Sequence, residues 1–268
     1  MWGWLHRLLA SNRSPRTVIP DWLWQQTLGD YPFLALLDSP ELLRLRELTG
    51  LFLERKEFHG AQGLVITDAM AAAIAAQACL PVLHLGAGAQ ALAWYDDFVG
   101  IVVHPGEVVA QREVVDELGV VHRYSEVLVG EAMESGPVML SWQDVAAASS
   151  ELGYNVVIHE FVHKLDLRDG LPDGCPPLSA GFMGAASARQ ARLAWLATLQ
   201  TAFDDFREQV IRCDRFGGEP TWLDPYGAES VDEFFAVASE AYFINREWFN
   251  RDFASLVALF DAFFKPGH

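Results

Sequence analysis

The amino-acid sequence predicts an α+β fold that is mostly helical and contains a small mixed or antiparallel sheet. Three observations carry this prediction. Long stretches before and after the middle of the chain repeat apolar residues at helical spacing. Residues 98–142 instead form short valine-rich or alternating runs, which are typical of strands. An apolar segment with two histidines and a glutamate, residues 155–166, follows these runs.

The composition is that of a globular protein with an acidic surface. A chain of 268 residues with 51% hydrophobic content can bury a substantial core, as one large domain or two coupled ones. The net charge of −17 predicts a surface that repels nucleic acid and anionic membranes, so we expect no direct binding to nucleic acid. Three cysteines without a CxxC pair suit a reducing cytoplasm, and no segment is apolar over a length that spans a membrane.

We expect three consecutive parts that form one compact unit. Residues 1–20 end in a run of Ser, Asn, Arg and Pro without periodicity, which predicts a flexible lead-in. Residues 21–97 form a helical N-terminal part. Residues 98–268 contain the strand-like runs and the histidine segment, and we expect them to form the catalytic part.

The N-terminal part opens with a helical pattern over residues 21–58, in which Leu42, Leu45 and Leu48 recur every three residues. Thr67 is an N-cap signal for an alanine-rich helix that continues to about residue 79. A GxGxxA string follows at residues 86–91. A dinucleotide-binding fold would also need regular βαβ repeats and an acidic residue about 20 positions later, so we interpret the string as a glycine-rich turn.

The runs that predict strands are separated by short connections, which favour antiparallel hairpins. They cover residues 98–104, 108–115, 120–128 and 137–142. The last run contains Val138, Met139 and Leu140 and lies just before the histidine segment. We consider it a candidate edge strand for an extended peptide, with an ordinary core or edge strand as the alternative.

The part formed by residues 98–268 continues with a Gly- and Pro-rich loop over residues 169–184 and a helix over residues 187–212. Another loop, residues 213–227, precedes a final helical stretch from residue 230 nearly to residue 265.

The histidine segment contains the motif HEFVH, residues 159–163. In a helix, His159 and His163 lie one turn apart on one face, which suits two ligands of one metal ion. Glu160 lies about 100° round the helix and suits a general base for a water bound by zinc. The alternative is a chance HExxH on a surface helix, but the apolar residues around the motif favour a buried helix whose histidines need partners.

Catalytic zinc usually takes three protein ligands and keeps a fourth position for water. Downstream of His163 the candidates are acidic, because the only later histidine is the last residue. Glu229, Glu233 and Glu240 lie close together in the sequence, and Glu233 and Glu240 share one helical face. Since charged residues facing a core are costly unless paired or metal-bound, one of the two could bind the metal while the other supports it.

The stretches HEFVHKLD and YGAESVDEFFAVASEAYF resemble the Mlc titration factor A family of bacterial metallopeptidases. Three upstream stretches are also similar to that family: KEFHGAQGLVITDAM, AAQACLPVLHL and GPVMLSW. The likeness spans roughly residues 20–260. It implies a zincin-like fold of the gluzincin type, related to the catalytic domain of anthrax lethal factor.

The resemblance also implies roles for individual residues. The zinc ligands of the family fall on His159, His163 and Glu233, for one Zn²⁺ per chain, and a family tyrosine falls on Tyr226. Glu160 would then be the base, and Tyr226 would donate a hydrogen bond to the oxyanion. Without the resemblance, Tyr226 would be interpreted as a turn residue.

Two further residues are candidates for accepting hydrogen bonds from the ligand histidines. Metal-bound imidazoles normally give their other N–H to an acceptor, and Asp166 and Glu240 are the available carboxylates.

The functional expectation is a cytoplasmic zinc-dependent peptidase that acts on a peptide or protein. The family implies aminopeptidase-type activity and, through its enteric member, binding of the transcriptional repressor Mlc and regulation of sugar uptake. The alternative is a non-catalytic protein that sequesters a repressor and carries a vestigial zinc site.

Overall fold

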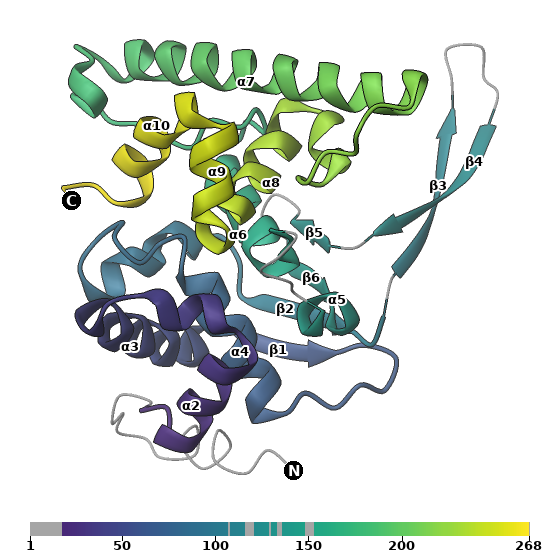
Figure 1. Ribbon diagram of the computed structural model, residues 1–268. Coiled ribbons are helices and arrows are strands. Elements are labelled where there is room, and N and C mark those ends of the chain that lie inside the picture. The colour runs from purple at the N-terminus through teal and green to yellow at the C-terminus, as the bar shows by residue number, and fades with distance from the viewer. Residues whose placement is uncertain are drawn as a thin grey trace.

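The computed structural model describes residues 18–106, 108–115, 121–128, 130–132, 136–147 and 153–267. Most of these residues are helical, which confirms the mostly helical prediction, and the helices surround a small sheet (Figure 1). The lead-in predicted for residues 1–20 lies almost entirely outside the described residues. No helix in the described part of the chain is long and apolar enough to cross a membrane.

Three α-helices and two 3₁₀ helices precede or flank the first strands. They are α2 (Asp21–Asp30), η1 (Pro32–Leu36), α3 (Ser39–Arg55), α4 (Asp68–Cys79) and η2 (Gly88–Tyr95). The Thr67 hydroxyl accepts a hydrogen bond from the backbone N–H of Met70, so the predicted N-cap of α4 is present. All the alanines of α4 except the partly buried Ala69 are buried, and their small side chains let α2, α3 and α6 approach this helix closely.

The GxGxxA string lies in a turn and the start of η2, and α4 and a turn, rather than a strand, come directly before it. This agrees with a glycine-rich turn and not with a dinucleotide-binding loop, which needs a strand before its first glycine.

The main sheet has four strands in the order β1-β2-β6-β5. These are β1 (Glu57–Gly60), β2 (Gly100–His104), β6 (Val138–Ser141) and β5 (Gly130–Ala132). The first three are parallel, and β5 pairs antiparallel with β6, so the sheet is mixed. The prediction of hairpins is wrong for β2, which pairs in parallel with β1 and β6, whereas β6 does pair antiparallel with β5, the strand before it in the sequence. The helical pattern predicted to residue 58 ends at Arg55, and β1 was missed.

A second, two-stranded sheet is antiparallel, as predicted for this region. It consists of β3 (Val108–Val115) and β4 (Val121–Leu128), which pair along their whole length. Figure 1 shows this pair projecting from the rest of the molecule.

The prediction of an edge strand at Val138, Met139 and Leu140 is wrong. These residues belong to β6, which pairs with β2 on one side and with β5 on the other. Both rows of backbone hydrogen-bonding groups on β6 are therefore used, and in the described sheet β5 is the edge on this side.

Helices complete the chain after the sheet: α5 (Trp142–Ala146), α6 (Val156–Asp166), α7 (Ala188–Phe216), α8 (Val231–Ile244), α9 (Arg246–Asp252) and α10 (Ala254–Phe264). Short 3₁₀ turns lie between them: η3 (Leu167–Asp169), η4 (Phe182–Gly184) and η5 (Pro225–Ala228). The stretch predicted as helical from residue 230 to 265 is three helices, because Asn245 ends α8 and its side chain caps the N-terminus of α9.

Apolar side chains from both parts of the chain form one core. Figure 1 places α6 between the N-terminal helices and the C-terminal helices. The side chain of Phe161 on α6 packs against Phe52 of α3 and against Tyr95 of η2. The helix with the HEFVH motif is therefore fixed from the N-terminal side as well as by α8.

Candidate metal centre

The start of α6 is defined by Asn155, whose side-chain oxygen accepts a hydrogen bond from the backbone N–H of Ile158. From this N-cap, the helical repeat places His159 and His163 on the same face, with ring centroids 4.7 Å apart. Both imidazoles are largely shielded from solvent, and their Nε2 atoms are 3.1 Å apart. Two imidazole nitrogens at this distance point to a shared partner.

Glu233 of α8 supplies the third donor. Its Oε2 atom lies 3.1 Å from Nε2 of His159 and 3.3 Å from Nε2 of His163. Donors about 2.0–2.1 Å from one tetrahedral ion are about 3.3 Å apart, so these three distances fit a single zinc ion. Two histidines and a glutamate are also a donor set that catalytic zinc uses. Among the described residues, this is the group of three that could hold a metal ion.

Local structure explains why Glu233 reaches the histidines. The Ser230 hydroxyl caps α8 by accepting from the backbone N–H of Glu233, which places this glutamate in the first turn. Just before it, Gly227 lies so close to α8 that a Cβ atom would come within 3.2 Å of the Val237 side chain. This close contact holds η5 against the helix.

Glu160 lies beside the donor group and not in it. The residue is 3% exposed, and its buried Oε2 atom has no hydrogen-bond partner among the described residues. Burial raises the pKa of Glu160 to about 7, against the opposite influence of His159 and His163. A buried carboxylate oxygen without a partner is costly, so its retention next to the donors fits a role in handling a proton there.

The raised pKa predicts a pH-dependent stability difference for the metal-free chain. The unfolded chain ionises Glu160 near its ordinary pKa of 4.5, whereas the folded chain holds the proton to about pH 7. This residue therefore lowers the free energy of unfolding as pH rises through that window. In urea titrations without metal, the free energy of unfolding of Glu160→Gln should exceed that of the wild type by less than about 1 kcal/mol at pH 5 and by about 3 kcal/mol at pH 8. The same difference at both pH values would contradict this prediction.

Glu240 lies behind His159, on the side away from the other donors. Its Oε1 atom is 2.8 Å from Nδ1 of His159, and its Oε2 atom accepts the backbone N–H of Asn155. With the Nδ1 proton given to Glu240, the lone pair of Nε2 faces Glu233 and His163. Glu240 is 1% exposed, and burial raises its pKa against the opposing contact with His159.

The ring of Tyr226 lies close to that of His159, with centroids 6.1 Å apart, and the residue is 44% exposed. Its hydroxyl donates a hydrogen bond of 3.3 Å to Oε1 of Glu233, the carboxylate oxygen that does not face the histidines. Asp224 fixes the turn by accepting the backbone N–H of Tyr226. Burial, followed by the charge of Glu233, raises the pKa of Tyr226 well above its ordinary value, so this phenol stays protonated and able to donate.

Comparison with known proteins agrees with this arrangement. The profile of the family described as glucose-regulated metallo-peptidase M90 matches residues 6–265. The chain belongs to the M90 metallopeptidase family. It is also 33% identical over 243 residues to proteins named Mlc titration factor A from Yersinia pestis (strain Pestoides F) and Yersinia pseudotuberculosis (serotype O:1b), a match that covers 90% of this chain and 83% of each relative. The sequence resemblance to the Mlc titration factor A family is therefore confirmed.

Asp166 was the other carboxylate predicted to accept an N–H of a ligand histidine in this M90 protein. Unlike Glu240, it is not hydrogen-bonded to either histidine in the described structure, and its Oδ2 atom instead accepts the backbone N–H of Gly174 at 2.9 Å. Burial raises the pKa of Asp166 to about 7. The carbonyl of Gly174 in turn accepts the indole N–H of Trp195. Asp166 thus ties the loop after α6 to α7.

Sequence reasoning missed two polar residues near the site of this M90 protein, Asn155 and Gln77. Asn155 directly precedes an apolar helical run, and this N-cap signal could have identified it. Gln77 is a single amide within an alanine-rich helix, and nothing local indicates that it lies near the histidines.

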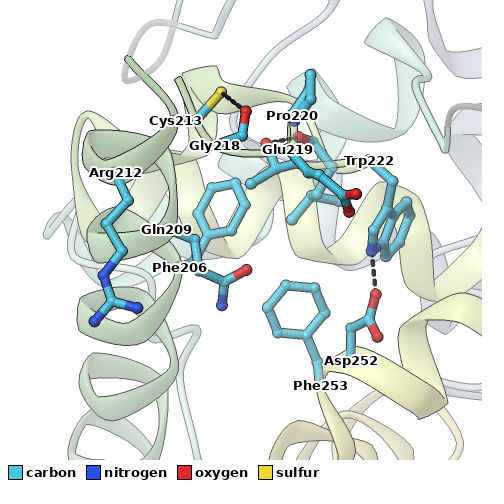
Figure 2. A pocket seen from close by; sticks show the side chains of 12 residues that line it. Phe206, Gln209, Arg212, Cys213, Gly218, Glu219, Pro220, Trp222, Asp252 and Phe253 are labelled. Atoms are coloured by element: carbon cyan, nitrogen blue, oxygen red, sulfur yellow. Dashed lines mark hydrogen bonds between the residues drawn. The ribbon is translucent and has the colours of Figure 1, made fainter. Parts of the chain in front are cut away.

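A surface hollow of about 360 Å³ lies apart from the metal donors. Figure 2 shows it between the end of α7, residues 218–223 and the end of α9, with the Trp222 indole hydrogen-bonded to Asp252. Part of its lining comes from the loop that the sequence predicted at residues 213–227, and none of its lining residues belongs to the donor group. The Trp222 ring also lies close to Gly153, just before α6.

Proposed function

We propose that this M90 protein is a zinc-dependent peptidase whose site consists of His159, His163, Glu233, Glu160 and Tyr226. One observation carries the proposal. Three donor atoms converge at distances that fit one zinc ion, and the buried, unpartnered oxygen of Glu160 lies next to them. A structural zinc site is closed by four protein ligands, so it holds no metal-bound water whose proton that oxygen could accept.

Each residue has a distinct task in this proposal. Zn²⁺ held by the three donors would lower the pKa of a bound water toward about 7 and polarise the scissile carbonyl. Glu160 accepts the proton of the attacking water and passes it to the leaving amine. Glu240 keeps His159 in the tautomer whose Nε2 can bind the metal, through the 2.8 Å contact with Nδ1.

Tyr226 serves the developing negative charge on the substrate oxygen. Its hydroxyl now donates to the outer oxygen of Glu233 and would turn to the substrate when one is bound. The exposed position of this side chain allows such a movement.

The peptide would extend along the edge of the sheet. In the described sheet the edge strand on this side is β5, and α6 packs against both β5 and β6. Backbone groups on the side of β5 that has no partner in the described sheet could pair with an extended peptide close to α6, the helix that carries His159 and His163. We further propose that the protein works in the cytoplasm as one unit of residues 21–97 and 98–268, with aminopeptidase-type activity as the family resemblance implies.

A peptide-library digestion tests the proposed function. The purified chain is loaded with one equivalent of zinc and given peptides with free or acetylated N-termini. We expect cleavage that a chelator abolishes and added zinc restores, and faster cleavage of the free N-termini. Zinc binding at this site without any cleavage would overturn the peptidase proposal.

Replacement of the tyrosine tests its assigned role. We expect Tyr226→Phe to lower kcat about 100-fold while zinc affinity and KM change little, because the hydroxyl acts on charge that develops only in the transition state. The check is steady-state kinetics on the best library peptide. A variant with unchanged kcat would show that Tyr226 does not serve the oxyanion.

A second candidate function is binding of a transcriptional repressor. It is favoured by the relatives named Mlc titration factor A and by the net charge of −17, which suits a basic surface on a partner. The chain would compete with DNA for the repressor. Titration of an Mlc-type repressor bound to labelled operator DNA should release the DNA, and no release at tens of micromolar would exclude this function for that repressor.

A further inference from the structure

A chain of buried polar side chains leads from the metal donors into the N-terminal helices. Glu240, Asn155 and Gln77 are each at most 1% exposed. Glu240 joins His159 to the backbone N–H of Asn155, and the side-chain amide of Asn155 donates to Oε1 of Gln77 at 2.5 Å. Gln77 lies on α4, far from α6 in the sequence, 78 positions before Asn155.

The neighbours determine how both amides are oriented. The Oδ1 atom of Asn155 must face the backbone N–H of Ile158, because only an acceptor can cap α6 there. Its Nδ2 atom is then buried and needs an acceptor, which is Oε1 of Gln77. The Nε2 atom of Gln77 turns the other way and donates to the carbonyl of Ala73. Each amide therefore has a single orientation that satisfies its hydrogen bonds.

Asn155 connects this arrangement to the donors at two points. Its side chain sets where α6 begins, and its backbone N–H holds the carboxylate that faces Nδ1 of His159. A shift of Asn155 would move both the start of the helix and the position of Glu240. A series of hydrogen bonds thus runs from Gln77 of α4 through Asn155 and Glu240 to Nδ1 of His159.

We propose that Gln77 is a positioning residue for the metal centre, acting through Asn155 and Glu240 on His159. The inference rests on the proposed zinc site and adds the N-terminal part of the chain to it. Gln77 contacts neither metal donors nor substrate. Its effect is on how well the donors are preorganised for the ion.

Zinc affinity, measured by competition with a chromophoric chelator, is the first readout. Gln77→Met keeps the side-chain volume but leaves Nδ2 of Asn155 without an acceptor. We expect the zinc Kd to rise about 5- to 10-fold, because losing a direct hydrogen-bond partner of a metal ligand costs about 10- to 100-fold and Gln77 acts less directly. Gln77→Glu keeps an acceptor oxygen in either protonation state and should stay within about 2-fold of the wild type. A Met variant with unchanged Kd would overturn the proposal.

A matched control separates positioning from loss of stability. Ile74→Val, a fully buried change on the same helix, costs about 0.5–1.5 kcal/mol and should leave the zinc Kd unchanged. The visible spectrum of the cobalt-substituted chain should change for Gln77→Met and not for Ile74→Val. Equal effects of the two variants would assign Gln77 a purely structural role.

A double-mutant cycle tests the route through Asn155. Asn155→Ser keeps an oxygen that caps α6 but removes the amide that needs Gln77. In this background Gln77→Met should change the zinc Kd by less than about 2-fold. The same 5- to 10-fold loss in both backgrounds would overturn the route. If the wild type binds zinc and Gln77→Met leaves the zinc Kd unchanged, this inference alone is refuted. If the wild type binds no zinc, the proposed function and the inference are refuted together.

Discussion

Glu160→Gln is expected to keep its zinc and to lose turnover by about 10²- to 10⁴-fold, the contribution of a positioned general base. The amide has the shape of the carboxylate but cannot accept a proton. The donors are other side chains, His159, His163 and Glu233, so the metal content should stay at one zinc per chain. Metal analysis and peptide hydrolysis on the same preparation check the two halves of this result.

The outcome distinguishes three explanations. Unchanged turnover in Glu160→Gln would mean that another group handles the proton. Loss of zinc would mean that Glu160 helps to hold the metal, against the geometry that leaves its Oε2 atom outside the donor group. If the wild type and Glu160→Gln both bind zinc and neither cleaves a peptide, the repressor-binding function would be favoured.

The part of the site that lies on α6 could be predicted from the sequence, because it depends on local geometry. A helix of any origin places residues four apart on one face, and the apolar residues around HEFVH indicated that the face is buried. The structure has this helix at Val156–Asp166, with His159 and His163 facing each other. No information about distant residues was needed.

The partners of α6 could not be derived in the same way. Helical spacing placed Glu233 and Glu240 on one face of α8 and left open which of them binds the metal. The resemblance to a family favoured Glu233. The structure shows the physical difference: Glu233 lies in the first turn and faces both Nε2 atoms, whereas Glu240 lies deeper and faces Nδ1 of His159.

The sheet was mispredicted because strand pairing is not a local property. Valine-rich or alternating runs predicted strands at residues 98–104 and 137–142, but the short gaps between the runs favoured hairpins. In the structure these strands are parallel neighbours, with β3 and β4 outside the main sheet between them in sequence. The strand β1 has only four residues directly after α3, too few for a periodic signal. As a result the sequence predicted a sheet edge at β6, whereas in the described sheet this edge is β5.

The contact between Gln77 and Asn155 shows the same limit for polar residues. Each residue has an ordinary local explanation, as a helix-interior amide and as an N-cap. Only the packing of α4 against α6 shows that they share a hydrogen bond and that it leads to His159. A buried polar chain of this kind is specified by the fold as a whole, because every member needs its partner already in place.

Glu233→Ala is expected to release the metal, with a zinc Kd at least about 100-fold weaker than that of the wild type, since loss of a ligand exceeds the 10- to 100-fold effect of losing a supporting contact. The two histidines alone leave the ion with half of its tetrahedral positions open. Glu229→Ala is the matched control: it removes a carboxylate from the same acidic stretch that lies outside the donor group, and it should bind zinc normally.

The metal-free Glu233→Ala chain should remain folded, because Glu233 is partly exposed and its hydrogen bonds are to residues of the site itself. Circular dichroism of the variant and the wild type, both without metal, checks this point. Burial opposes ionisation of Glu233, but the hydrogen bonds with His159 and His163 outweigh it and hold its pKa below the ordinary value. Removal of this carboxylate therefore also removes the negative charge that draws a cation to the two imidazoles. A folded variant that keeps stoichiometric zinc would exclude Glu233 as a ligand and, with it, the three-donor geometry on which the proposed peptidase depends.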